Sequence, residues 1–140
     1  MFLPFFMFSC GDVNQKTTKD LKNPTSEVDT NYNPEAVLDS LGIILRDQGI
    51  PVANYVHAVR TGNLLFLAGK GPKQANGENI IGKLGDSLTI DQGYQAAREV
   101  GINQLSVLKA ELGNLNKVKR IVSVHGMVNA SPDFTDHSKV

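Results

Sequence analysis

The sequence predicts an α+β domain, because segments with strand periodicity lie on both sides of one long segment with helical periodicity. Residues 54–70 have the pattern of two strands joined by a tight turn, and residues 118–129 are again rich in β-branched side chains. Between them, residues 90–112 repeat apolar side chains at helical steps. With 140 residues, 41% of them hydrophobic and 20% charged, the chain has the composition of one folded soluble domain.

A short helix is expected ahead of the first strand. Asn33 is a suitable N-cap, and Pro34 fits the first helical position, where its missing N–H removes no hydrogen bond. Gly42 then ends the helix. We expect this helix to pack on the edge of the domain through an apolar face that consists of Ala36, Val37, Leu38 and Leu41.

Residues 54–70 predict a β-hairpin. Its first half alternates as in a half-buried strand, whereas the apolar run at 64–68 predicts a strand that is nearly fully buried. Residues 61–63, with the sequence Thr-Gly-Asn, supply the turn. Gly69 follows the second strand and exposes its backbone, so it is a candidate for ligand contact. The alternative is an ordinary hairpin in which Gly69 marks only a bulge.

The helix over residues 90–112 has the clearest signals in the chain. Thr89 and Gln92 have the spacing of a capping box, and Gly113 follows the last turn as a stop signal. Small side chains at two positions of its expected buried face would let the helix approach a sheet closely. That face is formed by Tyr94, Ala97, Gly101, Leu105, Leu108 and Leu112, the small positions being Ala97 and Gly101.

Further strands are expected on both sides of this helix. Residues 71–79 predict a polar loop, and residues 80–81 predict a short strand after it. Residues 118–129 predict a longer strand that is mostly buried. Residues 131–134, with the sequence Ser-Pro-Asp-Phe, then predict a turn, although the first two of them also have the pattern of a helix start.

Charge and histidine spacing exclude several classes of function. Lys and Arg together number 14, as do Asp and Glu, so the chain has no basic field that would gather a nucleic acid. The basic residues of 117–120 are expected to be a solvated rim, and no nucleic-acid partner is expected. His57, His125 and His137 lack the spacing of metal ligands, so neither a metal site nor another cofactor is expected.

Residues 1–10 resemble a bacterial lipoprotein signal that ends at Cys10. The apolar run before Cys10 ends in a small residue and is too short to span a bilayer. Cys10, the only cysteine, cannot form a disulfide within the chain and would become the lipidated first residue. Residues 11–32 would then be a flexible linker, and the lipid alone would anchor the domain to a membrane, facing the periplasm or the exterior. The run lacks the positive start of a usual signal, and the alternative is a free thiol in a cytoplasmic protein.

Residues 54–70 resemble the signature hairpin of the RidA/YjgF family of small imine and enamine deaminases. In that family an aromatic hairpin is followed by the triplet Ser-Gly-Gln, where this chain has Ala68-Gly69-Lys70. The sequence Pro-Val-Ala-Asn-Tyr at 51–55 is similar to a divergent branch of the family. The resemblance runs from about residue 38 to the last residue, and its further matches are 82–85, 88–98, 112–122 and 128–136.

The resemblance implies a chorismate-mutase-like mixed sheet with helices on one face. It also implies a homotrimer in which each active cleft lies between neighbouring subunits. Only part of that fold lies before residue 140, so residues 33–140 are expected to be a partial domain, incomplete at the C-terminus. The second helix, the closing strands and the carboxylate-binding arginine would be missing, and the chain is expected to be inactive by itself.

The same resemblance implies hydrolysis of small carboxylated imines, with Tyr55, Gly69 and Lys70 as ligand-binding residues. Tyr55 matches the aromatic that lines the cleft, and Gly69 offers its backbone to the ligand. Lys70 replaces the glutamine and would bind a carboxylate as a point charge. No catalytic residue is assigned. The altered triplet favours an alternative, a non-catalytic trimeric module of the same fold that binds a small ligand or a protein. A third reading, RNA cleavage, is opposed by the neutral charge.

Overall fold

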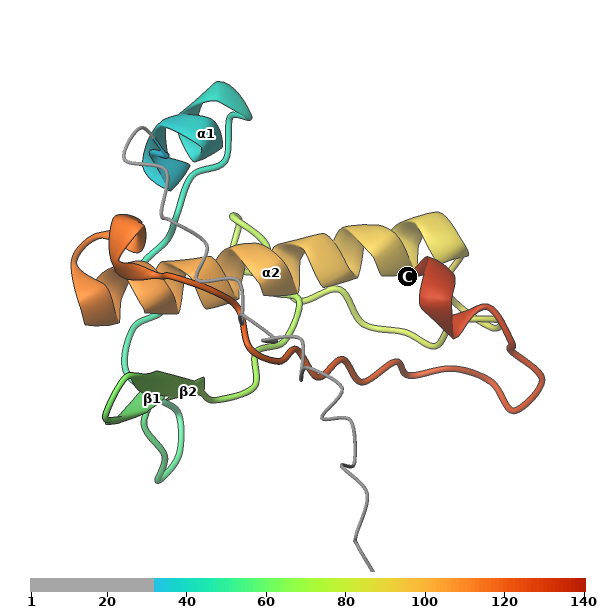
Figure 1. The fold of residues 1–140 in the computed structure, drawn as a ribbon. Helices are drawn as coiled ribbons and strands as arrows, with labels where there is room; N and C mark the ends of the chain where they lie inside the picture. The colour runs from blue at the N-terminus through green and yellow to red at the C-terminus, as the bar shows by residue number, and fades with distance from the viewer. Residues whose placement is uncertain (1–31) are drawn as a thin grey trace, which may run out of the picture.

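The structure, a computed structural model, describes residues 32–140, which form an α+β arrangement around one long helix (Figure 1). The hairpin and the first helix lie on opposite sides of that long helix in Figure 1. The predicted α+β class is therefore confirmed. In chain order the elements are α1 (Pro34–Ser40), β1 (Ala58–Thr61), β2 (Leu64–Leu67), α2 (Ile90–Leu112) and two short 3-10 helices, η1 (Leu115–Lys117) and η2 (His137–Lys139).

The expected signal at residues 1–10, its Cys10, and nearly all of the expected linker at 11–32 lie outside the described residues. The lipid anchor and the linker therefore stay predictions. Among the helices of residues 32–140, none combines the length and the apolar character that crossing a membrane requires.

Helix α2 begins and ends where its sequence signals place it. The Thr89 hydroxyl accepts the backbone N–H of Gln92 at 3.2 Å, and the Gln92 side chain accepts the N–H of Thr89 at 2.9 Å. These two bonds satisfy donors that the first turn of a helix leaves free. At the other end, the Gly113 N–H donates to the Lys109 carbonyl. The helix predicted over residues 90–112 is thus confirmed.

The buried face of α2 is not the predicted one. Of the predicted face only Leu108 is buried, and Tyr94 is 57% exposed. The prediction was wrong because it counted apolar side chains alone, whereas the packed face includes two polar residues, Asn103 and Ser106, that are buried through hydrogen bonds. The residues that α2 buries are Gly93, Ile102, Asn103, Ser106, Val107 and Leu108.

Close approach to α2 occurs at Gly93 and not, as predicted, at Ala97 and Gly101. A Cβ on Gly93 would lie 2.8 Å from Leu84 Cδ2, whereas a Cβ on Gly101 would meet no atom within 4 Å. The absence of a side chain at Gly93 therefore leaves room for Leu84, the most buried apolar side chain outside α2. Together these contacts make a small core, which consists of Leu84, Ile102, Val107, Leu108 and Leu115.

Helix α1 confirms the short helix predicted after Asn33. The Asn33 side chain accepts the N–H of Ala36, and Pro34 occupies the first helical position. Glu35, in the first turn, ties α1 to the far end of α2, because its carboxylate accepts both Lys109 Nζ and the Leu115 N–H. One carboxylate thus joins α1, α2 and η1.

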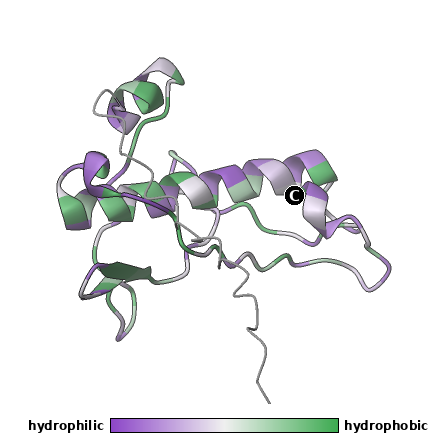
Figure 2. Cartoon of the chain, viewed as in Figure 1, coloured by the Kyte–Doolittle hydropathy of each residue, from purple (hydrophilic) through white to green (hydrophobic). Residues whose placement is uncertain are grey.

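Strands β1 and β2 form the predicted antiparallel hairpin, with Ala58 opposite Leu67 and Thr61 opposite Leu64. Gly62 has a φ of +54°, which suits the first central position of a two-residue type II′ turn. The expected burial of the second strand was wrong, since Phe66 is 59% exposed. Figure 2 shows these exposed strands in the hydrophobic colour. The sheet of residues 32–140 has two strands, so the larger mixed sheet that the resemblance implies is not shown.

The strands predicted at 80–81 and 118–129 are absent from the described residues. Residues 118–129 run as an extended trace below α2 (Figure 1), and Met127 is 96% exposed. A strand needs a neighbour to pair its backbone groups, and no strand of residues 32–140 lies in register with this segment. The prediction failed because a single segment specifies its own propensity but not its partner.

A short clip holds the end of this segment. The Leu84 N–H donates to the Asn129 carbonyl at 3.0 Å, and the Ser131 N–H donates to the Leu84 carbonyl at 2.8 Å. Gly85 has a φ of +77°, and a Cβ there would lie 2.5 Å from Ser131 Oγ, so only glycine fits. The turn predicted at 131–134 is confirmed by the bond from the Phe134 N–H to the Ser131 carbonyl, whereas no helix begins at Ser131.

Candidate functional site

Three side chains meet at the open end of the hairpin, and two of them are predicted ligand-binding residues. Lys70 Nζ lies 2.8 Å from His57 Nδ1, and the Tyr55 ring packs edge to face on the His57 ring with centroids 6.0 Å apart. The other ring nitrogen, His57 Nε2, lies 3.0 Å from the Gly49 carbonyl oxygen. The structure thus brings Tyr55 and Lys70 together around a histidine that the sequence did not single out.

The contacts of His57 define which nitrogen carries the proton. A carbonyl oxygen only accepts hydrogen bonds, so Nε2 is the protonated nitrogen and donates to Gly49. In the neutral imidazole, Nδ1 then holds a lone pair and accepts from the Lys70 ammonium. If His57 takes that proton, the Lys70 amine becomes the acceptor instead. The contact therefore suits a pair that carries one shared positive charge.

Burial lowers the pKa of the Lys70 ammonium below its ordinary value. Lys70 is half-buried, and a charged amine loses part of its hydration there. The neutral amine is consequently more accessible at Lys70 than at a fully hydrated lysine, and a neutral amine is the form that acts as a base or a nucleophile.

Lys70 is placed by the end of strand β2. The Ala68 N–H donates to the His57 carbonyl at 2.9 Å, which extends the ladder of the hairpin by one step. Gln104, on α2, donates its side-chain N–H to the Ala68 carbonyl at 3.0 Å. Gly69 is exposed, as predicted for a backbone that faces a ligand, although a Cβ there would meet no atom. Its role in binding stays a prediction.

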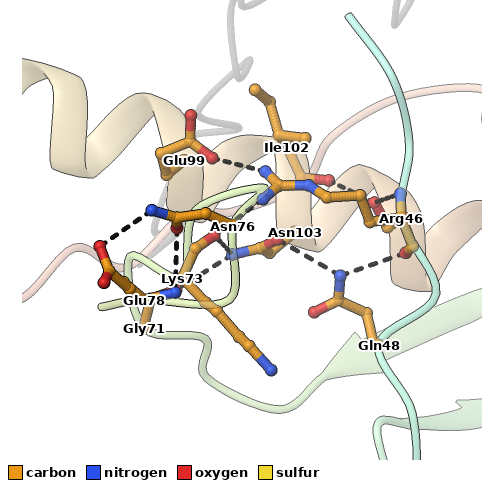
Figure 3. A network of polar contacts seen from close by, with 10 residues as sticks. Arg46, Gln48, Gly71, Lys73, Asn76, Glu78, Glu99, Ile102 and Asn103 are labelled. Carbon is orange, nitrogen blue, oxygen red and sulfur yellow. Dashed lines mark hydrogen bonds and ion pairs between the residues drawn. The ribbon is translucent and has the colours of Figure 1, made fainter. Parts of the chain in front are cut away.

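A buried amide on α2 fixes the loops on either side of this pair (Figure 3). Asn103 is 3% exposed, and its side-chain N–H groups donate to the carbonyls of Gly71 at 3.2 Å and Lys73 at 3.0 Å. Its oxygen accepts Gln48 Nε2 at 3.3 Å. Gln48 precedes the residue that binds His57, and Gly71 follows Lys70. One amide therefore positions both halves of the pair.

Arg46 reinforces the same arrangement. Its backbone N–H donates to Ser106 Oγ at 3.0 Å, and its guanidinium donates to the Lys73 carbonyl and to the Glu99 carboxylate. The Arg46–Glu99 pair is about four-fifths shielded, so it holds its geometry better than a surface pair does. Arg46 is thus occupied in fixing the loop at 71–79 onto α2.

Two concavities of residues 32–140 lie away from this pair. One, of about 520 Å³, is open and lies between residues 83–86 and the turn at 131–134. A second, of about 310 Å³, is lined by Ile80, Leu88 and residues of the first turns of α2. Neither includes Tyr55, Gly69 or Lys70. No group of three or more acidic, histidine or cysteine side chains that could hold a metal occurs in the part of the chain described.

The residues that sequence reasoning missed are His57, Gln48 and Asn103. The turn residues contain the signal for His57. A two-residue turn at Gly62 puts position 57 opposite 68, as observed, and the same register continued outward would put position 55 opposite 70. Side chains at 55, 57 and 70 then share one face, where diagonal pairs interact. No comparable signal marks Asn103, because a polar residue on a helix is exposed by default.

Comparison with known proteins gives relatives but no family. No family model matches the chain. Protein TCP17 of Trypanosoma cruzi is 42% identical over 105 residues, which are 75% of this chain and 66% of that protein. The chain therefore spans just under two thirds of this curated relative.

Two solved structures share the fold. One, from Shewanella oneidensis and provisionally named an endoribonuclease, matches with a TM-score of 0.73 and 28% identity over 77% of this chain and 72% of its own. The other, a protein of unknown function from Agrobacterium tumefaciens, matches with a TM-score of 0.66 and 31% identity over 75% of this chain and 64% of its own. The described residues thus share their α+β fold with these two bacterial proteins.

Proposed function

We propose that the chain is a RidA/YjgF-like domain whose hairpin end binds a small carboxylated imine and promotes its hydrolysis to a 2-oxo acid and ammonia. The observation that carries this proposal is the contact of 2.8 Å between Lys70 Nζ and His57 Nδ1, beside the Tyr55 ring. The family resemblance puts the ligand at this same end of the hairpin, and the matches to solved α+β structures support the fold.

The chemistry of imine hydrolysis fits a pair that shares one proton. Water that attacks the C=N carbon must lose a proton, and the nitrogen that leaves as ammonia must gain one. His57 and Lys70 can accept and return a proton at adjacent atoms, since the proton can lie on either side of their contact. The Tyr55 ring, about two-fifths exposed, offers an apolar wall for the carbon skeleton.

The test is an assay of the full chain on 2-iminobutanoate generated in situ by an amino-acid-dehydrating enzyme. The sequence alone leads us to expect an inactive chain, but the contact between Lys70 and His57 supplies a pair that can transfer a proton. We therefore expect 2-oxobutanoate to form faster than in the uncatalysed reaction, and Lys70→Met to remove most of that acceleration. Lys73→Met is the matched control, because Lys73 is exposed and contributes to the network only through its backbone. No acceleration by the wild-type chain, or equal acceleration by all three proteins, would contradict the proposal.

The non-catalytic alternative predicts binding without turnover. It is favoured by Ala68, which lacks the hydroxyl that the family has at this position, a hydrogen bond of about 1 kcal/mol. Titration calorimetry with 2-oxobutanoate separates the two, since a binding module would release heat on titration and leave the hydrolysis rate unchanged.

Cleavage of RNA is a second candidate, because one solved structure with this fold is provisionally named an endoribonuclease. The equal numbers of acidic and basic residues oppose it. Incubation with a labelled single-stranded RNA decides the matter. Cleavage that survives purification over a second column and is lost in a site variant would favour this candidate over the imine.

We further propose that copies of the chain associate as a trimer, which the exposed apolar side chains of the hairpin support. Val59, Leu64 and Phe66 are each about half exposed on strands that no other element covers. Light scattering should give three times the mass of the chain, and Phe66→Ser should lower it. Val52→Ser, at an exposed position outside the sheet, serves as the matched control.

A further inference from the structure

We propose that the Lys70 amine is a nucleophile that forms a covalent imine with C2 of the bound substrate, while His57 carries the protons. This inference rests on the proposed function and deepens it. Instead of water attacking the bound imine first, the amine attacks, ammonia leaves, and water then releases the 2-oxo acid from the lysine. The resemblance to the family does not imply this role, because the family has glutamine where this chain has Lys70.

The geometry supplies a base at the right atom. His57 Nε2 is held by the Gly49 carbonyl at 3.0 Å, so the lone pair of Nδ1 points at Lys70 Nζ, 2.8 Å away. A lysine attacks only as a free amine, and an adjacent general base is one way in which an enzyme activates a nucleophile. The partial burial of Lys70, which disfavours its charged form, acts in the same direction.

The proton balance of the reaction closes on these two side chains. His57 Nδ1 takes a proton from the Lys70 ammonium, and the freed Nζ electron pair forms a bond to C2 of the substrate imine. The π electrons of the original C=N bond move to the substrate nitrogen. His57 returns its proton to that nitrogen, then takes a second proton from Nζ and passes it to the same nitrogen. The nitrogen leaves as ammonia with the electrons of its bond to C2, while the Nζ lone pair forms the C2=Nζ bond. Water then adds to C2 of the lysine imine, and His57 passes the two water protons one at a time to Nζ. The C2–Nζ bond breaks with its electrons going to Nζ, so the 2-oxo acid leaves and the Lys70 ammonium is restored. Nothing is oxidised or reduced.

The other lysines of residues 32–140 lack this environment. Lys109 is paired with Glu35 and Lys139 with Asp136, and Lys117 donates to the Leu112 carbonyl. Lys73, Lys83 and Lys119 are exposed, and no side-chain base is found in contact with their ammonium groups. Lys73 is therefore an internal reference: it lies three residues from Lys70 in the same loop and differs in the absence of an imidazole.

The experiment traps the lysine imine by reduction. The full chain is incubated with 2-oxobutanoate and sodium cyanoborohydride, which converts the imine into a stable secondary amine, and peptide mass mapping locates the added group. We expect Lys70 to be labelled at least about tenfold faster than Lys73 in the same sample, because a neutral amine next to a base reacts faster. Lys70→Met should lose the fast label, and Lys73→Met should keep it.

Two variants test the role of His57. His57→Gln should slow labelling of Lys70 about a hundredfold, the usual contribution of a general base. Lys70→Arg keeps the positive charge and should show no fast label, so a loss of labelling cannot be due to lost charge. Circular dichroism melting checks that each variant folds. If His57→Gln melts early, labelling at a temperature where it is folded decides the point.

Several outcomes separate this inference from the proposed function. Lys70 and Lys73 labelled at the same slow rate in wild type would overturn the inference, even if the chain hydrolyses the imine. Fast, specific labelling of Lys70 without turnover would support the inference and contradict the proposed deaminase. Fast labelling that persists in His57→Gln would remove His57 from the reaction and overturn its half of the proposal.

Discussion

Helix α2 and the extended segment at 118–129 differ in where their backbone hydrogen bonds are made. Every interior N–H of α2 bonds within the helix, and the ends are closed by the Thr89 capping box and by Gly113. Within residues 32–140, the segment at 118–129 makes backbone hydrogen bonds only at its two ends, where the Val118 N–H donates to Leu115 and the Asn129 carbonyl accepts from Leu84. The helix is also packed, whereas Met127 is almost fully exposed. A helix that makes its backbone hydrogen bonds internally is a rigid support, and the loops of the candidate site are accordingly held by side chains of α2.

Asn103→Ala should have the largest effect on stability, because it removes a buried side chain of α2 that holds two loops. The change removes three hydrogen bonds, and the Gly71 and Lys73 carbonyls each lose one of their two donors. We expect the free energy of unfolding to fall by about 3 kcal/mol, as measured by urea denaturation. Labelling of Lys70 should slow as well.

The matched control for this change is Asn116→Ala, whose side chain is exposed and should cost less than about 0.5 kcal/mol. Equal small losses in the two variants would mean that α2 does not hold the loops.

Val107→Thr and Val124→Thr compare the two regions with the same substitution. Val107 is 1% exposed on α2, so its new hydroxyl loses water and the variant should lose about 1–3 kcal/mol of stability. Val124 lies in the extended segment and is mostly exposed, so its variant should stay within about 0.5 kcal/mol of wild type. Thermal melting of the dilute chain measures both. A large loss at Val124 would show that the segment is covered in solution.

Gly93→Ala and Gly101→Ala sharpen the assignment of the buried face within α2. Alanine at 93 pushes on Leu84, which has no free space, so we expect a loss of about 1–2 kcal/mol. Alanine at 101 meets nothing and gains helix propensity, so we expect a gain of about 0.5–1 kcal/mol. If the signs of the two changes in unfolding free energy were reversed, the sequence-based face of α2 would be the correct one after all.

Glu35 should give the smallest effect, and it depends on pH. The bond to Lys109, and then the Leu115 N–H, lower the pKa of this carboxyl below its ordinary value. A carboxyl with a lowered pKa in the folded state contributes stability above its unfolded pKa and loses it as pH falls through the folded value. Denaturation of wild type and Glu35→Gln from about pH 7 to about pH 3 should therefore show a difference that shrinks with acid. A constant difference would mean that the pair does not tie α1 to α2.

The elements that could be predicted are those whose signals are local. Asn33, the Thr89 capping box and the Gly62 turn each act over a few residues, and the structure places all three as expected. The face of α2 could not be predicted, because Asn103 is buried through partners far away in the chain. The segment at 118–129 failed for the same reason, since strand pairing is a property of two segments.

Of the candidate site, the hairpin and two of its ligand-binding residues could be named from the sequence. The proximity of Lys70 to His57 follows from the hairpin register and could also have been derived from the turn. The contact of His57 with Gly49 could not, because residues 43–57 have no regular structure from which a position follows.

The single amide of Asn103 has a consequence for motion. It is shared between Gln48 on one loop and the Gly71 and Lys73 carbonyls on another, so the opening of either loop leaves part of this buried amide unpaired and favours the opening of the other. Local opening of these two distant stretches is then one event, and their backbone amides should exchange with deuterium in step. A ligand that holds either loop would slow exchange in both, although it touches only one.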